Sequence, residues 1–184
     1  MIIAIFGVTC VGKTTIGELI ANDLNYAFFD LDAEMKRFYN DTIENIQRCC
    51  IGDELDIKKT LVLKDVLEKC GDSAVIAMSP IYYSVKYKLL FRNNNVLSIL
   101  LQDSPENIVK RLVYTDDFDL VIENPKRDNK AELKDIRYFI SRYKKAFDRI
   151  EQKHFIDGKT ADVAANEIIE TIIKPYCAAN GIEV

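Results

Sequence analysis

The stretch Gly7-Val8-Thr9-Cys10-Val11-Gly12-Lys13-Thr14 decides the fold of this chain. Its spacing is G-x-x-x-x-G-K-[ST], the pattern of a phosphate-binding loop. The two glycines let the backbone curl so that successive N–H groups point at phosphate oxygens. We therefore predict that nucleotide contacts come from this loop and the residue after it, namely Gly7, Val8, Thr9, Cys10, Val11, Gly12, Lys13, Thr14 and Thr15.

Two side chains at the end of the loop carry the predicted chemistry. The ammonium of Lys13 adds positive charge near the terminal phosphates, so Lys13 is a candidate catalytic residue. The hydroxyl of Thr14 is a candidate ligand for Mg²⁺. A helix that starts here directs its positive N-terminal end at the same anion. We therefore expect ATP and Mg²⁺ as cofactors.

The residues on either side of the loop fit this interpretation. Residues 1–6 form a near-continuous apolar run, which is typical of a strand buried on both faces. After the loop, apolar residues recur at helical spacing at Ile16, Leu19, Ile20 and Leu24. The alternative, a glycine-rich turn with an incidental lysine, would not require a strand before it and a helix after it.

Composition limits the classes of protein that this chain can represent. Its 184 residues, of which 48% are hydrophobic, predict one domain spanning residues 1–184. The net charge of −4 and the pI of about 5.2 argue against nucleic-acid or membrane-surface partners. The five cysteines show no metal or disulfide spacing, which favours free thiols in a reducing cytoplasm. We expect a cytoplasmic protein that is a monomer or a weak dimer.

A second predicted strand ends in two carboxylates. Residues 26–32 read Tyr-Ala-Phe-Phe-Asp-Leu-Asp, so Asp30 and Asp32 follow an apolar run. Ligands of open α/β sheets gather at the carboxyl ends of strands, and side chains two apart on a strand point the same way. We predict that one of the two carboxylates, Asp30 or Asp32, holds a Mg²⁺-bound water and that the other accepts a hydrogen bond from the hydroxyl of an acceptor. The alternative is that Asp32 only caps the next helix.

Strands and helices alternate along the rest of the chain, which predicts an α/β fold with a parallel sheet of about five strands and helices on both faces. The expected strands are residues 1–6, 26–32, 74–78, 96–101 and 154–157. One helix is expected directly after the loop, and another begins at Ser104-Pro105-Glu106. Further helices are expected at residues 33–50, 56–70, 81–92, 133–150 and 163–172, and Pro175 is expected to stop the last of these.

A long polar segment interrupts this alternation. Residues 115–129 are mostly polar and contain Pro125, and a connection of this length in a compact domain is usually functional. We predict that it is a lid. The region from Lys126 to Lys153 has an excess of basic residues, which either face the phosphates or form a solvated helix face.

The chain resembles the shikimate kinases, a family of nucleoside-monophosphate-kinase-like P-loop proteins. The resemblance is strong in residues 12–21 and 25–32, and residues 101–112 resemble the segment that precedes the family's lid. It implies a three-layer fold with strand order 2-3-1-4-5. It also implies that Lys13 and Thr14 bind phosphate and Mg²⁺ and that Asp30 supports the metal. It implies further that Asp32, favoured over Asp30, contacts the acceptor hydroxyls and takes the proton, and that Arg111 lies against the adenine.

The departures from the family pattern concern the acceptor. Where the family has a Phe-Arg pair, this chain has Asp56-Ile57, with Lys58 one position later. Where the family has three glycines after its middle strand, this chain has Met78-Ser79-Pro80. The candidate substitutes for the family's lid and helix arginines are Lys126, Arg127, Arg137 and Arg142.

Three functions remain open from the sequence. The first is Mg·ATP-dependent phosphorylation of shikimate. The second is the same transfer to a hydroxyl of another small metabolite, such as a polyol acid or a nucleotide. The third is a nucleotide-binding protein without transfer activity. The loop motif supports all three, and the altered acceptor residues separate them.

Overall fold

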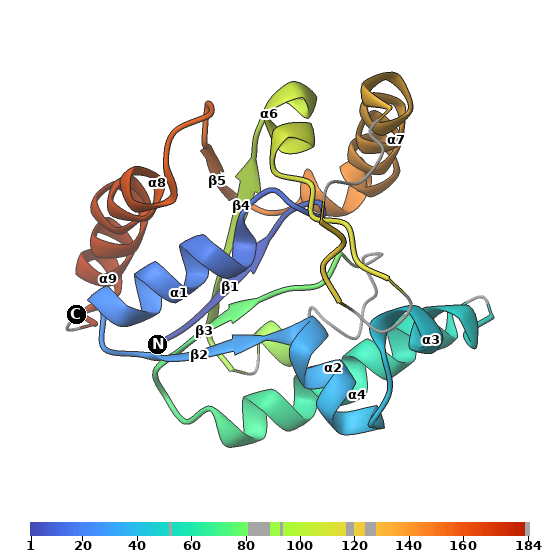
Figure 1. Ribbon diagram of the computed structural model, residues 1–184. Coiled ribbons are helices and arrows are strands. Elements are labelled where there is room, and N and C mark those ends of the chain that lie inside the picture. Colours follow the sequence, from blue (N-terminus) through green and yellow to red (C-terminus); the bar gives the residue numbers. More distant parts are fainter. Residues whose placement is uncertain (52, 81–88, 93, 117–119, 124–127, 183–184) are drawn as a thin grey trace.

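The computed structural model describes residues 1–51, 53–80, 89–92, 94–116, 120–123 and 128–182. Within these residues, a five-stranded sheet has the order β2-β3-β1-β4-β5, and all four strand pairs are parallel (Figure 1). Its strands are β1 (Ile2–Phe6), β2 (Ala27–Asp30), β3 (Ala74–Ala77), β4 (Val96–Gln102) and β5 (Gln152–Phe155). The α/β fold and the strand order predicted from the sequence are confirmed.

Strand β1 lies at the centre of the sheet because it is apolar on both faces. Ile3 pairs with Val75 of β3 on one side and with Leu97 of β4 on the other. Ile3 and Ile5 point into one hydrophobic core, while Ile2 and Ala4 point into a second core on the opposite face. The sheet is therefore the middle of three layers, and its central strand leads directly into the phosphate-binding loop.

The first face of the sheet is covered by α1 (Lys13–Asp23) and by the C-terminal helices (Figure 1). Helix α1 packs closely on the sheet, because a Cβ at Gly17 would lie 2.8 Å from Phe28 Cε2. The same core receives side chains from α6 (Pro105–Lys110), α7 (Asn129–Phe147) and α8 (Ala161–Ile168). This packing fixes the position of α1, and with it the end of the loop.

The second face is covered by α2 (Leu31–Tyr39), α3 (Ile43–Arg48) and α4 (Glu54–Lys69). The buried side of α4 carries Val62, Leu63, Val66 and Leu67. The expected single helical region over residues 33–50 is divided into α2 and α3, because Asn40 adopts a left-handed conformation with φ of 50°. Of the helix expected at 81–92, residues 89–92 are helical and residues 81–88 lie outside the described residues.

The prediction that Pro175 stops the last helix is wrong. A π-helical turn at Ile169–Ile173 leads from α8 into α9 (Lys174–Asn180), and Pro175 lies in the first turn of α9. Proline is tolerated there, since its missing N–H is not needed for the first turn of a helix. The chain therefore continues as a helix to Asn180, where Gly181 ends it in a left-handed conformation.

The described part of the predicted lid contains an isolated antiparallel bridge between Thr115 and Val121. Residues 117–119 and 124–127 of that segment, including Lys126 and Arg127, lie outside the described residues. Its last two residues belong to α7, since Asp128 caps that helix and Asn129 begins it. Among the described helices, none has the length and apolar character needed to cross a membrane.

Candidate active site

The phosphate-binding loop connects β1 to α1 and has the backbone shape that its glycines predict. Gly7 and Gly12 adopt φ values of 150° and 114°. A Cβ at Gly7 would lie 2.6 Å from Val11 Cγ1 and 2.8 Å from the carbonyl oxygen of Leu101, so only glycine fits there. Among the described residues, no side chain caps the N-terminus of α1. Its first N–H groups therefore suit the phosphates of a nucleotide.

Lys13 is the first residue of α1, and its side chain folds back over the loop. Its Nζ donates a hydrogen bond of 3.0 Å to the carbonyl oxygen of Val8. Burial lowers the pKa of Lys13, and the negative charges of Asp32 and Asp30 oppose that effect. The structure thus gathers the loop lysine and both predicted carboxylates into one electrostatic cluster.

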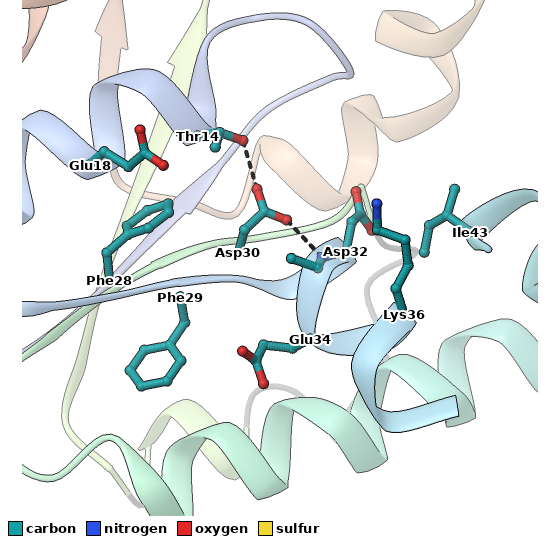
Figure 2. Close-up of a pocket in the computed structure, with 10 residues that line it drawn as sticks. Thr14, Glu18, Phe28, Phe29, Asp30, Asp32, Glu34, Lys36 and Ile43 are labelled. Carbon is teal, nitrogen blue, oxygen red and sulfur yellow. Dashed lines mark hydrogen bonds between the residues drawn. The ribbon is translucent and has the colours of Figure 1, made fainter. Parts of the chain in front are cut away.

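Thr14 and Asp30 meet directly in the structure. The hydroxyl of Thr14 donates a hydrogen bond of 2.6 Å to Asp30 Oδ2 (Figure 2). Asp30 Oδ1 accepts hydrogen bonds from the backbone N–H groups of Asp32, at 2.9 Å, and Ala33, at 3.2 Å. Asp30 therefore caps helix α2 with one oxygen and faces the candidate metal ligand Thr14 with the other.

The placement of the two carboxylates on one strand is wrong. Strand β2 ends at Asp30, and α2 begins at Leu31, so Asp32 lies in the first turn of a helix. The alternative that Asp32 is the cap is also wrong, because the cap is Asp30. Both carboxylates nevertheless face the loop, since a tight strand-to-helix turn at Asp30 brings Asp32 back toward it.

Two buried residues that sequence reasoning did not assign lie beside Asp32. Ser79 follows β3, and its hydroxyl donates a hydrogen bond of 2.6 Å to Asp32 Oδ1. Lys59 projects from α4, and its Nζ donates a hydrogen bond of 2.8 Å to the carbonyl oxygen of Pro80. A sequence signal for Lys59 existed, because it stands four residues after Leu55 and three before Val62, on the apolar stripe of α4.

A hollow of about 550 Å³ opens beside this cluster, along β2 at the edge of the sheet. Figure 2 shows that its side chains come from α1, β2, α2 and the start of α3. Besides Thr14, Asp30 and Asp32, it is lined by Glu18, Phe28, Phe29, Ala33, Glu34, Lys36 and Ile43. The two predicted carboxylates are therefore reached from solvent through this hollow.

Arg111, the residue expected against the adenine, forms an ion pair with Asp103 at the end of α6. Its Nη2 donates a hydrogen bond of 2.6 Å to Asp103 Oδ2, and the Asp103 side chain is fully buried. Burial acts to raise the pKa of Asp103, but hydrogen bonds from Asn107, Arg111 and the Ser104 N–H outweigh it, so this pKa lies below its ordinary value. Arg111 thus joins the end of β4 to α6.

The other candidate arginines lie on the exposed side of α7. Arg137 Nη2 lies 2.9 Å from Glu106 Oε1, and both side chains are exposed. Arg142 Nη1 donates a hydrogen bond of 3.1 Å to the hydroxyl of Tyr138 on the same helix. Arg137 thus links α7 to α6. Burial raises the pKa of Tyr143, the residue after Arg142, and Arg142 opposes this effect while Asp56 of α4 adds to it.

Replacing Arg111 with alanine is expected to lower the free energy of unfolding by about 1–2 kcal/mol near neutral pH, because Asp103 loses a charged partner. Because the pKa of Asp103 is lower in the folded than in the unfolded protein, its ionised form stabilises the fold at pH values above the ordinary carboxyl pKa. This stabilisation is lost as the pH falls through the folded-state pKa. The difference between the two proteins should therefore shrink below about pH 4. Urea unfolding at both pH values measures it.

Arg137→Ala is the matched control, since its ion pair with Glu106 is exposed on both sides. We expect no measurable change in stability from it. An equal loss in both variants would contradict a special role for the Asp103–Arg111 pair.

Asp30 allows its two contacts to be separated by mutation. Asp30→Ala is expected to lower the free energy of unfolding by about 1 kcal/mol, because α2 loses its cap, and to weaken Mg²⁺-dependent nucleotide binding. Asp30→Asn keeps an oxygen that can cap α2, so it should lose cation binding but retain stability. Thermal unfolding and calorimetric titration with Mg²⁺ and a nucleotide measure both effects. Equal stability of the alanine and asparagine variants would contradict the cap.

The loop after the central strand, its uncapped helix and the neighbouring carboxylates define a P-loop protein. The family model of shikimate kinase matches residues 9–173. A shikimate kinase of Caldicellulosiruptor saccharolyticus is 30% identical over 135 residues, which cover 68% of this chain and 72% of that protein. The chain belongs to the shikimate kinase family.

Two further comparisons agree with this assignment. The crystal structure of shikimate kinase from Bacteroides thetaiotaomicron has the same fold, with a TM-score of 0.76, 17% identity and coverage of 94% of this chain and 98% of that one. The pentafunctional AROM polypeptide of Schizosaccharomyces japonicus is 32% identical over 75 residues. That match covers 41% of this chain but only 5% of the polypeptide.

Proposed function

We propose that this protein transfers the terminal phosphoryl group of Mg·ATP to a hydroxyl of a small metabolite in the cytoplasm, as a monomer or weak dimer, with shikimate as the first candidate acceptor. The observation that carries the proposal is the hydrogen bond between Thr14 and Asp30. It joins the end of the phosphate-binding loop to the strand end that supplies the carboxylates. Membership of the shikimate kinase family supports the same reaction.

The residues of the site divide into two groups in this proposal. The first group would bind Mg·ATP: the loop N–H groups and Lys13 would hold the phosphates, Thr14 and Asp30 would hold Mg²⁺, and Arg111 would lie against the adenine. Bound Mg²⁺ supplies charge neutralisation on the phosphates. These residues stabilise charge on the phosphoryl group mainly by position, since this reaction needs little covalent chemistry from the protein.

Asp32 acts on the acceptor. It orients the acceptor hydroxyl and takes its proton while the hydroxyl oxygen forms a bond to the γ-phosphorus. The bond from the γ-phosphorus to the bridging oxygen breaks, and ADP leaves. Closure of the segment at residues 115–129 over the site would exclude water and so limit futile hydrolysis of ATP.

A second candidate function is transfer to a different small acceptor, such as a polyol acid or a nucleotide. The supporting observation is the hydrogen bond from Ser79 to Asp32. Ser79 occupies a position at which the family has glycine. Proline at position 80 also removes one backbone donor, and Asp56-Ile57 occupy the positions of the family's Phe-Arg pair. The residues near the acceptor differ from the family pattern, whereas the phosphate-binding loop does not. This difference favours an acceptor other than shikimate with the same nucleotide.

The test is release of ADP from Mg·ATP, measured in a coupled assay with a panel of hydroxylated acceptors. Turnover that depends on shikimate supports the first acceptor, and turnover with another acceptor supports the second candidate. Tight ATP binding with no stimulation by any acceptor would instead indicate a nucleotide-binding protein without transfer activity. Absence of nucleotide binding by folded protein would overturn all three.

A further inference from the structure

The hydroxyl of Ser79 contacts Asp32 in a way that the proposed reaction does not require. Ser79 is 3% exposed, and its Oγ lies 2.6 Å from Asp32 Oδ1. A short hydrogen bond to a carboxylate is stronger than one between neutral groups. The contact joins the segment after β3 to the first turn of α2, two parts of the chain that are 47 residues apart.

Lys59 holds the segment that carries Ser79. It is 4% exposed, and its Nζ bonds the carbonyl oxygen of Pro80, the residue after Ser79. Burial lowers the pKa of Lys59, and the charges of Asp32 and Asp56 oppose this effect. A lysine is rarely buried without a specific partner, so the contact with Pro80 gives this side chain a definite place.

These contacts form one connected path. Helix α4 anchors Pro80 through Lys59, Pro80 fixes the backbone beside Ser79, and Ser79 fixes one oxygen of Asp32. The Oδ2 atom of Asp32 lies outside this path. An acceptor hydroxyl would therefore meet a carboxylate that is already oriented, rather than one that must lose rotational freedom during the reaction.

We propose that Ser79 is a positioning residue for Asp32, and that Lys59 keeps Ser79 in place through the carbonyl oxygen of Pro80. The inference rests on the proposed function, in which Asp32 orients the acceptor. Ser79 occupies Oδ1, so the acceptor hydroxyl binds Oδ2 and its proton passes to Oδ2. Ser79 itself does not touch the acceptor in this arrangement.

The test compares Ser79→Ala, Ser79→Thr and Lys59→Met with the unmodified protein, using the acceptor that gives turnover. Ser79→Ala should lower kcat about tenfold, change the KM of the acceptor much less, and leave ATP binding unchanged. Ser79→Thr retains a hydroxyl and should restore most of kcat. Lys59→Met should follow Ser79→Ala, and it carries the test if the alanine variant does not fold.

Thr60→Val is the matched control. Thr60 is next to Lys59, and its hydroxyl donates a hydrogen bond of 2.6 Å to the backbone carbonyl of Asp56, within α4. Its loss should leave kcat unchanged. Unchanged kcat in Ser79→Ala would overturn the proposal, and so would a loss of kcat that threonine does not restore.

A crystal structure of Ser79→Ala separates this inference from the proposed function. If the unmodified protein phosphorylates no acceptor, the proposed function fails, but the orientation of Asp32 can still be compared. A carboxylate that turns or adopts several orientations without the Ser79 hydroxyl supports the positioning role. A carboxylate that keeps its orientation overturns it.

Discussion

Replacing Lys13 with methionine is expected to lower kcat for phosphoryl transfer by about 10²- to 10³-fold, the cost of removing one charged donor from a phosphoryl-transfer site. The ammonium is the positive charge of the loop, and it bonds Val8 within the loop itself. Methionine keeps most of the side-chain length, and Lys13→Ala should give the same loss. A coupled ADP assay measures turnover, and calorimetry measures nucleotide binding.

The fold should survive this change. Lys13 contributes one hydrogen bond and is only half-buried, so circular dichroism and thermal unfolding should stay close to those of the unmodified protein. Lys159→Met is a suitable control, since Lys159 is an exposed lysine that pairs with Glu167 of α8 and lies outside the phosphate-binding loop. Normal turnover in the Lys13 variant would refute the mechanism.

Asp32→Asn is expected to lower kcat by about 10²- to 10⁴-fold, the usual contribution of a positioned general base. Asparagine has the shape of aspartate and can still accept the Ser79 hydrogen bond, but it cannot take a proton from the acceptor. ATP binding should change little, because the loop and Asp30 are untouched. Steady-state kinetics and nucleotide titration together separate the two effects.

Asp162→Asn is the matched control, since Asp162 also lies in the first turn of a helix, but on α8 and exposed. That variant should have normal kcat. If Asp32→Asn also has normal kcat while Asp30→Asn is inactive, the proton acceptor is Asp30, and the role assigned to Asp32 is wrong.

The parallel sheet could be predicted because the information for its strands is local. A buried strand, a glycine-bearing loop and an amphipathic helix follow one another in the first part of the chain. Each is specified by neighbouring residues rather than by distant contacts. The strand order is not local information, and its prediction came from the resemblance to the shikimate kinases.

The turn at Asp30 could not be predicted with the same certainty. Asp30-Leu31-Asp32 suits the end of a strand as well as the start of a helix, and the apolar run before it continues the strand pattern. Helix α2 begins at Leu31 because Asp30 accepts from two backbone N–H groups, and Thr14 holds Asp30 from another element. The tertiary contact decides between two local structures of similar propensity.

The burial of Lys59 and Ser79 beside Asp32 was not predicted from the sequence, for a related reason. A lysine in an amphipathic helix is normally assigned to solvent, and a serine before a proline to a turn. Both are buried here because they bond to groups that the fold brings together from α2, β3 and α4. The apolar stripe of α4 could indicate that Lys59 is buried, but no local pattern indicates which distant groups Lys59 and Ser79 contact.

The two carboxylate oxygens of Asp30 make different contacts, and this difference has a consequence for the binding and release of a cation. Oδ1 serves only helix α2, while Oδ2 receives only the hydroxyl of Thr14 among the contacts of the described chain. A cation that draws Thr14 away from Asp30 disturbs Oδ2 alone. In the proposed reaction, exchange of the cation would therefore leave the cap of α2 in place, and hydrogen exchange at the first turn of α2 should be the same with and without Mg²⁺.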